Sequence, residues 1–200
     1  MTDRPHSEAA ARNRVPIADA LARALPPTGR LLEIGSGTGQ HACYCAARLH
    51  GWGWQPSEHP GMLQTLNAGL ADSPDNVEAP LTLDVAGEWP GDRFDAVFSA
   101  NTAHIMHWPE VEAMFSGVAR VLNGSGCFLL YGPFKRDGIH HADSNAAFDA
   151  SLQARDPGMG VRDLVDVDAL AGRVGLMRTA ELLLPANNHI LMFQHREVAQ

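Results

Sequence analysis

The stretch that decides the fold is Leu31-Leu32-Glu33-Ile34-Gly35-Ser36-Gly37-Thr38-Gly39-Gln40-His41. An apolar run ends in an acid, and three glycines follow at alternate positions. Glycine has no Cβ, so it adopts positive φ and lets a ligand approach the backbone closely. A helix that begins at about Gln40 would point its free N–H groups and the positive end of its dipole into this turn. The stretch therefore predicts a strand, a turn and a helix that together hold a nucleotide-like cofactor.

The spacing of the glycines decides between two classes of cofactor site. A dinucleotide-binding loop has its third glycine one place later, where this chain has Gln40, which disfavours a nicotinamide oxidoreductase. The pattern of Glu33, Gly35, Gly37 and Gly39 resembles the first motif of the class I methyltransferases, which bind S-adenosylmethionine. The resemblance implies that these four residues bind that cofactor. An alternative interpretation leaves Glu33 only a charge near a helix N-terminus.

The rest of the chain alternates between strand-like and helix-like segments, which predicts a parallel sheet covered on both faces. Helices are expected at about 9–25, 40–49, 62–71, 111–121, 145–154 and 163–174, and strands at 30–34, 51–56, 79–85, 94–100, 126–131, 176–184 and 189–194. No helix separates the last two strands, so they are expected to be antiparallel. The predicted fold is α/β, with a Rossmann-like, seven-stranded, mostly parallel sheet, an antiparallel last strand and helices on both faces.

A chain of 200 residues suits one domain. Within this single methyltransferase-like domain, residues 1–28 are expected to form an N-terminal helical cap, 29–135 a cofactor-binding half and 136–200 a substrate-side half. The polar segment 132–144 is expected to be either a mobile lid or a plain surface crossover.

Composition excludes several classes of partner. The chain has 15 lysines and arginines against 23 acids, a net charge of −8, which disfavours nucleic acid. No apolar run approaches the roughly 20 residues that span a membrane, and the first residues lack the apolar core of a signal peptide. The 3 cysteines fit a reducing compartment, so a cytoplasmic protein is expected. The oligomeric state is left open.

Polar residues also follow the next three predicted strands, at the edge of the sheet where ligands of open α/β folds bind. Glu58 lies about 20 residues beyond Gly39, near the offset at which an acid meets ribose hydroxyls. Asp84 is expected to accept from the adenine amino group, and Asn101 to lie near the methionine part. The alternatives are a solvated loop acid for Glu58, a cap of the turn before Gly87 for Asp84, and a turn former for Asn101.

A narrower resemblance covers nearly the whole chain. It is carried by Arg12-Asn13, Gly37-Thr38-Gly39-Gln40-His41, Trp54-Gln55-Pro56-Ser57, Tyr131-Gly132-Pro133-Phe134, Ser144-Asn145-Ala146-Ala147-Phe148-Asp149 and Pro185-Ala186-Asn187-Asn188. These motifs are similar to those of the uncharacterised family that includes methyltransferase-like protein twenty-six. The resemblance implies the class I fold and its cofactor, but it does not name the acceptor.

Transfer of a methyl group to a hydroxyl or an amine calls for a base, and histidine suits that role near neutral pH. His104, just beyond Asn101, is the first candidate. Tyr131 is the second, as an orienting group or a weak acid, and His141 in the 132–144 segment is the third. His104 has a competing interpretation as a partly buried residue that caps a helix.

Five further residues are expected to contact the substrate. Arg12 and Asn13 would bind a substrate carboxylate if the N-terminal helix folds over the pocket, because arginine pairs with carboxylates through two hydrogen bonds. Asn187 and Asn188 would line the far wall, or else form only a hairpin turn. His41 would touch the cofactor or the substrate, or cap its helix.

Two histidine-containing patterns invite a metal interpretation, His104-x-x-His107 and His140-His141-x-Asp143. A catalytic zinc site usually has three protein ligands, and no third ligand is evident near either pattern, so no metal is expected. The Asn/Asp-Pro-Pro-aromatic motif of many amino-group methylases is absent after the fourth strand. Together with the acidic charge, this favours a small-molecule acceptor, with oxygen preferred.

Overall fold

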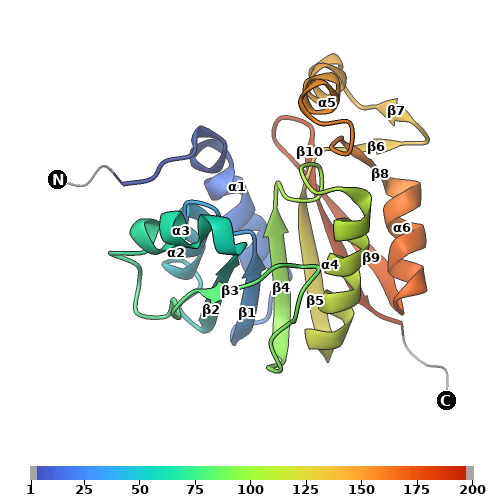
Figure 1. Ribbon diagram of the computed structural model, residues 1–200. Helices are drawn as coiled ribbons and strands as arrows, with labels where there is room; N and C mark the ends of the chain where they lie inside the picture. Colours follow the sequence, from blue (N-terminus) through green and yellow to red (C-terminus); the bar gives the residue numbers. More distant parts are fainter. Residues whose placement is uncertain (1–3, 197–200) are drawn as a thin grey trace.

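The computed structural model describes residues 4–196 and has three layers, with a central sheet between two layers of helices (Figure 1). The sheet has seven strands in the order β3-β2-β1-β4-β5-β10-β9. Their bounds are β1 Gly29–Ile34, β2 Trp52–Glu58, β3 Leu81–Thr82, β4 Phe94–Ala100, β5 Leu122–Gly132, β9 Leu176–Leu184 and β10 Asn188–His195. The strands from β3 to β5 are parallel, and β10 is antiparallel to both of its neighbours. The predicted fold class is confirmed.

Two apolar cores hold the layers together, one on each face of the sheet. On one face, α1 (Glu8–Ala24), α2 (Gln40–Ala46) and α3 (Leu63–Gly69) pack against β1, β2 and β4. On the other face, α4 (Trp108–Val121) and α6 (Leu164–Arg173) pack against β4, β5 and β10. Side chains of β4 alternate between the two cores, since Val97 belongs to one and Phe98 to the other. Both faces of the central strands are thereby excluded from water.

The starts of three helices follow from local side-chain chemistry. The Ser7 hydroxyl accepts a hydrogen bond from the Ala10 N–H at the start of α1, and the Asp163 carboxylate accepts one from the Val165 N–H at the start of α6. At α4, the Glu110 carboxylate reaches back to the His107 N–H. This contact starts α4 three residues before the predicted Val111.

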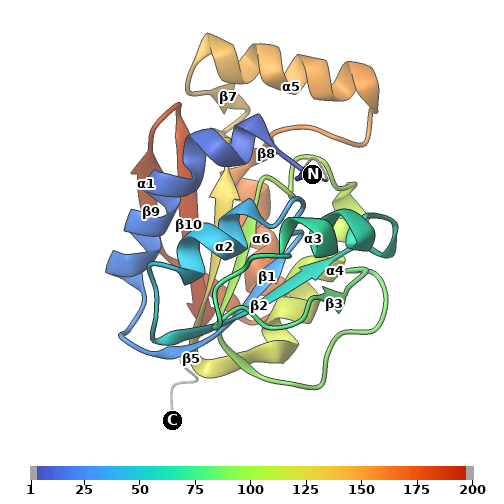
Figure 2. The same ribbon diagram turned by 90° about the vertical axis from the view of Figure 1, so that its left-hand side faces the viewer.

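The segment 132–144, which was expected to be either a mobile lid or a plain surface crossover, contains secondary structure of its own. It contains β6 (Phe134–Arg136) and β7 (Ile139–His140), which pair with β8 (Arg162–Asp163) in a second, three-stranded sheet. Asp137 and Gly138 both have positive φ, as a two-residue hairpin turn requires. The helix α5 (Asp143–Arg155) follows, and Figure 2 shows it lying above the ends of the central strands, beyond α1.

Several element boundaries differ from the sequence prediction, most of all those of two strands. The third strand is reduced to Leu81–Thr82, because it pairs only with the end of β2. The fifth strand begins at Leu122, where an irregular register lets it pair with Phe94 before the regular ladder. A short 3-10 turn, η1 (Pro60–Met62), precedes α3.

Across residues 4–196, none of the helices combines the length and the apolar character that crossing a membrane would require.

Candidate functional site

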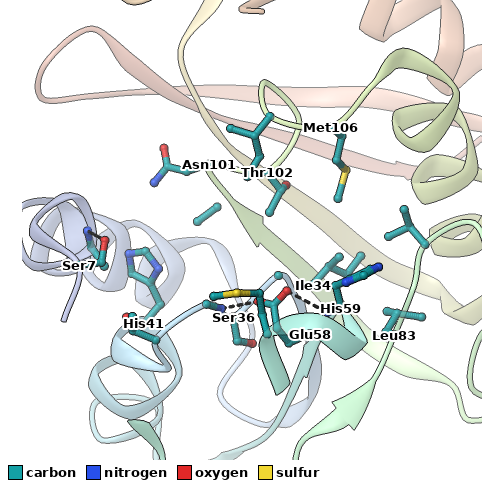
Figure 3. A pocket seen from close by; sticks show the side chains of 18 of the residues that line it. Ser7, Ile34, Ser36, His41, Glu58, His59, Leu83, Asn101, Thr102 and Met106 are labelled. Atoms are coloured by element: carbon teal, nitrogen blue, oxygen red, sulfur yellow. Dashed lines mark hydrogen bonds between the residues drawn. The ribbon is translucent and has the colours of Figure 1, made fainter. Parts of the chain in front are cut away.

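A cavity of about 510 Å³ lies at the carboxyl ends of β1, β2 and β4 (Figure 3). Four predicted site residues that carry polar side chains line it: His41, Glu58, Asp84 and Asn101. In Figure 3, Glu58 and Ser36 face Asn101, Thr102 and Met106 across the hollow. We refer to this space as the first cavity.

The glycine turn forms the floor of the first cavity. Gly35, Gly37 and Gly39 have φ values of 70°, 58° and 73°, which side chains other than glycine rarely adopt. A Cβ at Gly35 would come within 2.6 Å of Thr102, and one at Gly39 within 2.8 Å of Leu70. A Cβ at Gly37 would meet nothing within 4 Å. Gly37 is therefore where the backbone itself faces open space, while Gly39 serves packing and does not line the cavity.

Glu58 is fastened to this turn. Its Oε2 accepts a hydrogen bond from the Gly37 N–H at 2.6 Å, and its Oε1 accepts one from the His59 N–H at 2.8 Å. A carboxylate oxygen has two lone pairs, so each oxygen keeps one for a ligand. The contact orients Glu58 toward the cavity and leaves it able to accept two hydroxyl protons.

Glu33 does not line the first cavity. It is 1% exposed and lies behind the turn, where it accepts a hydrogen bond from Trp54 Nε1 at 2.9 Å. Burial raises the pKa of Glu33 to about 7, and hydrogen bonds from Trp54 and Ser36 only partly offset that rise. The structure thus places Glu33 as a support of the loop and not as a ligand-facing group.

Asp84 and Asn101 line the first cavity and also satisfy their alternative interpretations. The Asp84 carboxylate accepts from the Ala86 N–H at 2.9 Å, inside the turn that precedes Gly87. Asn101 has φ 61°, the left-handed conformation of a turn former, and its backbone N–H donates to the Tyr131 carbonyl at 3.0 Å. A strained backbone at a cavity wall is common at functional sites.

His41 lines the first cavity near Ser7 of α1 (Figure 3). Its Nε2 lies 2.7 Å from Oδ1 of Asn13. Burial lowers the pKa of His41 to about 4, so the ring is neutral at pH 7. A neutral ring can meet a carbonyl-type oxygen only through a protonated nitrogen, so Nε2 donates and Nδ1 keeps its lone pair.

A second cavity, of about 450 Å³, adjoins the first. The two share Ala9 and Asn101 in their walls. The remaining walls come from α1, the ends of β5 and β9, and α5. Its lining is Ala9, Arg12, Asn13, Pro16, Asn101, Tyr131, Pro133, Ser144, Asn145, Phe148, Pro185, Ala186 and Asn188.

Four residues expected near the substrate line this second cavity: Arg12, Asn13, Tyr131 and Asn188. Burial raises the pKa of the Tyr131 phenol, and a hydrogen bond from Asn13 opposes the rise. Asn187, which was also expected to contact the substrate, has φ 55° and does not line the cavity. Its carbonyl accepts from Asn145 Nδ2 at 3.2 Å, so Asn187 forms the hairpin turn of the alternative interpretation.

Two histidines expected in catalysis line neither cavity. His104 is 6% exposed and packs edge-on against Phe148, with ring centres 5.2 Å apart. Burial lowers the pKa of His104 to about 4, with the charges of Arg162 and Arg155 adding to the effect. The His141 ring lies beside that of His189, with centres 5.1 Å apart. The sequence analysis expected His104 at the end of the fourth strand and His141 in the 132–144 segment, but the structure packs the His104 ring against Phe148 of α5 and the His141 ring against His189 of β10.

Several lining residues were missed by the sequence analysis. Ser7, Ala9 and Ala10 cover the first cavity from α1, and Phe148 reaches the second from α5. Small residues at the start of a helix carry no chemical signal. Phe148 was within a motif of the family resemblance, and that was the one signal available for it.

In residues 4–196, no group of three or more His, Cys, Asp or Glu side chains is arranged to hold a metal ion. His107 pairs instead with Asp156, Nε2 to Oδ2 at 2.9 Å.

A family model described as "Protein of unknown function (DUF938)" matches residues 4–195. The chain belongs to the DUF938 family. This membership covers nearly the whole sequence, and the family description states no activity.

Solved structures show the same fold at low sequence identity. The mitomycin 7-O-methyltransferase MmcR is 18% identical, with a TM-score of 0.80 over 93% of this chain and 55% of that one. An O-methyltransferase family protein from Burkholderia thailandensis is 14% identical, with a TM-score of 0.80 over 96% and 59%. Human N-acetylserotonin methyltransferase, solved in complex with SAM, is 13% identical, with a TM-score of 0.79 over 94% and 53%. The chain therefore spans little more than half the length of these proteins.

Proposed function

We propose that this DUF938 protein is an S-adenosylmethionine-dependent methyltransferase acting on a small-molecule acceptor. The observation that carries the proposal is the Gly37 turn. Its backbone faces open space, and its N–H is held by a carboxylate that keeps two free lone pairs. The fold shared with the methyltransferases named above supports the proposal.

The residues of the first cavity fit this cofactor. Glu58 would accept from the two ribose hydroxyls, Asp84 would accept from the adenine amino group, and Gly37 would allow close approach of the amino-acid part. Leu83 and Met62 supply apolar surface along the same wall. Asn101 stands where the two cavities meet, so the methionine part would lie beside it.

The bound cofactor supplies a methyl group on a positively charged sulfur. An acceptor oxygen that took this methyl group would release its proton to water and leave S-adenosylhomocysteine in the first cavity. The chain's own contribution is to hold the acceptor oxygen in line with the methyl carbon, a form of positioning worth roughly 7–11 kcal/mol in well-oriented systems. Asn101 and Tyr131 are the polar side chains best placed for this, since Asn101 lines both cavities and Tyr131 the second.

The finer assignments remain proposals. An oxygen acceptor is favoured because two of the similar structures are described as O-methyltransferases. Membership of the family that includes methyltransferase-like protein twenty-six stays a prediction, and so does the cytoplasmic location. The catalytic roles of His104 and His141 would require a rotation of α5 or of the 132–144 segment, because neither ring borders a cavity.

Calorimetric titration of S-adenosylmethionine into the protein tests the cofactor. We expect binding that is lost, by at least a thousandfold or about 4 kcal/mol, in Gly37→Leu, because the new side chain would occupy the first cavity. Gly138→Leu is the matched control, since Gly138 also has positive φ and open space at its Cβ. Absence of binding by the unmodified protein at millimolar cofactor would overturn the proposal.

The rival function is an interaction module that binds the cofactor without moving the methyl group. It predicts binding but no formation of S-adenosylhomocysteine when the protein is incubated with cofactor and metabolite extract. A methyltransferase is expected to form it. The second cavity favours catalysis, because a module would not need a further hollow beside the cofactor.

A further inference from the structure

The second cavity has an unusual charge balance for this chain. The protein is acidic overall, with a net charge of −8. Yet the lining of this cavity includes one charged side chain, Arg12, and no carboxylate. The first cavity is the reverse, because Glu58, Asp84 and Glu110 line it. A ligand of the second cavity therefore meets one positive side chain and no negative one along its walls.

Arg12 has no acidic partner among the side chains of residues 4–196, since none of their ion pairs involves it. Other arginines, Arg23 of the same helix among them, also lack one, but Arg12 is the arginine that lines the second cavity. By contrast, Arg30 pairs with Glu78 and Asp92, and Arg178 pairs with Asp168 and Glu181. An unpaired guanidinium at the rim of a cavity can bind a carboxylate through two hydrogen bonds.

The hydroxyl of Tyr131 adds a second group that can donate a hydrogen bond, because Tyr131 lines the same cavity. The two cavities are also in contact through side chains, since His41, which lines the first, donates from Nε2 to Oδ1 of Asn13, which lines the second.

The remaining walls are largely apolar. The Phe148 ring is 38% exposed and lines the cavity together with Pro16, Pro133 and Pro185. The Asn188 amide is used within its own turn, where it donates to the carbonyls of Pro185 and Ala186, both at 3.3 Å. A ligand with an apolar body and a single anionic group would match this surface.

We propose that the second cavity binds the methyl acceptor, and that this acceptor is a small carboxylic acid with an apolar or aromatic body. Arg12 holds its carboxylate, Tyr131 donates to an acceptor oxygen, and Phe148 packs against its body. The inference rests on the proposed function, since it assigns the acceptor of the same site.

The test uses the protein saturated with S-adenosylhomocysteine and three probes of matched size, whose binding is followed by titration calorimetry. The probes are 4-hydroxybenzoate, its neutral amide 4-hydroxybenzamide, and the cation tyramine. We expect 4-hydroxybenzoate to bind at least tenfold more tightly than the amide, and tyramine to bind most weakly. The proposal would be overturned if the three probes bound with equal affinity, or if none of them bound. It would also be overturned if 4-hydroxybenzamide or tyramine bound more tightly than 4-hydroxybenzoate.

Two variants locate the effect. Arg12→Gln is expected to remove the tenfold preference for the acid while leaving the affinity for S-adenosylhomocysteine unchanged. Arg23→Gln is the matched control, because Arg23 is an exposed arginine of the same helix that lines neither cavity. A preference retained by Arg12→Gln would overturn the role of Arg12.

The same titrations separate this inference from the function on which it rests. Failure of S-adenosylhomocysteine to bind would end the cofactor assignment. Cofactor binding without any preference for the acid would end only the acceptor assignment.

Discussion

The two cavities differ in how their walls are built. The floor and one side of the first cavity come from residues 34–41 and from Glu58, and their polar groups are fixed by backbone hydrogen bonds. The second cavity collects residues from α1, from the ends of β4 and β5, from α5 and from the turn after β9. Its charged group, Arg12, makes no ion pair within residues 4–196. The first cavity is built around one local turn, to which α1, Asp84 and Asn101 add further walls, whereas the second has no such local centre and depends on how distant elements pack.

This difference fits the roles proposed for the two cavities, with the cofactor in the first and the acceptor in the second. A cofactor common to many proteins needs one fixed set of contacts, which a short stretch of chain supplies. An acceptor differs from one enzyme to another, and walls drawn from separate elements can change without disturbing the cofactor site. Arg12, Asn13, Asn101 and Tyr131 border the second cavity from outside residues 136–200. The division of the chain into a cofactor-binding half, 29–135, and a substrate-side half, 136–200, stays a prediction.

The largest expected effect is on the free energy of unfolding, and it comes from Glu33, the buried acid behind the glycine turn of the first cavity. The pKa of Glu33 is about 7 in the folded protein against 4.5 for a glutamate in water, so between these pH values the folded state retains a proton that the unfolded state releases. Stability from this group is complete below pH 4.5 and is lost as pH rises through 7, by roughly 3 kcal/mol. Glu33→Gln should lack this loss. Urea unfolding at pH 5 and pH 8 measures it.

Glu88→Gln is the control for this comparison, because Glu88 is exposed and lies outside both cavities. Its stability should follow that of the unmodified protein at both pH values. Parallel pH profiles for Glu33→Gln and the unmodified protein would show that the buried proton does not exist.

A smaller effect tests the ligand-facing side of the same loop. Glu58→Gln replaces one carboxylate oxygen by an amide nitrogen. This nitrogen accepts no hydrogen bond, neither from a backbone N–H nor from a ribose hydroxyl. We expect the affinity for S-adenosylmethionine to fall by about 1–3 kcal/mol, the cost of losing charged hydrogen bonds. Calorimetry measures the change. An affinity equal to that of the unmodified protein would remove Glu58 from the site.

The smallest effect concerns the contact between the two regions. Asn13→Ala removes the hydrogen bond partner of the buried His41 ring, at a cost of about 1 kcal/mol in the free energy of unfolding. Asn67→Ala is the control, since the Asn67 amide bonds only to the Leu63 carbonyl of its own helix on the exposed side. Urea unfolding compares the two. Equal destabilisation would mean that Asn13 does not join the regions.

The parts of the molecule that depend on local sequence were predicted well. The glycine turn, the strand before it and the helix after it follow from φ preferences and dipoles, which act within a few residues. The antiparallel strand β10 followed from the short connection after β9. The residue range of β3 did not follow, because an edge strand extends only as far as its one partner allows.

The parts that depend on packing were not predicted. Glu33 was expected to face the ligand, but the indole of Trp54 holds it behind the turn, and no local pattern shows that contact. His104 was expected at the mouth of the fourth strand, and the position of α5 covers it with Phe148. The second sheet escaped notice because its strands are only two or three residues long. The roles assigned to the site residues stay predictions.

Asn101 and Ala9 belong to the walls of both cavities. A molecule that displaces either residue from one side changes the shape presented to the other side. By thermodynamic linkage, if a ligand in the first cavity changes the affinity of the second cavity by some factor, a ligand in the second changes the affinity of the first by the same factor. The proposed cofactor and the proposed acceptor are thus expected to change each other's binding affinity by the same factor. Asn101, whose backbone is left-handed, is the polar residue through which that coupling would act, because it lines both cavities.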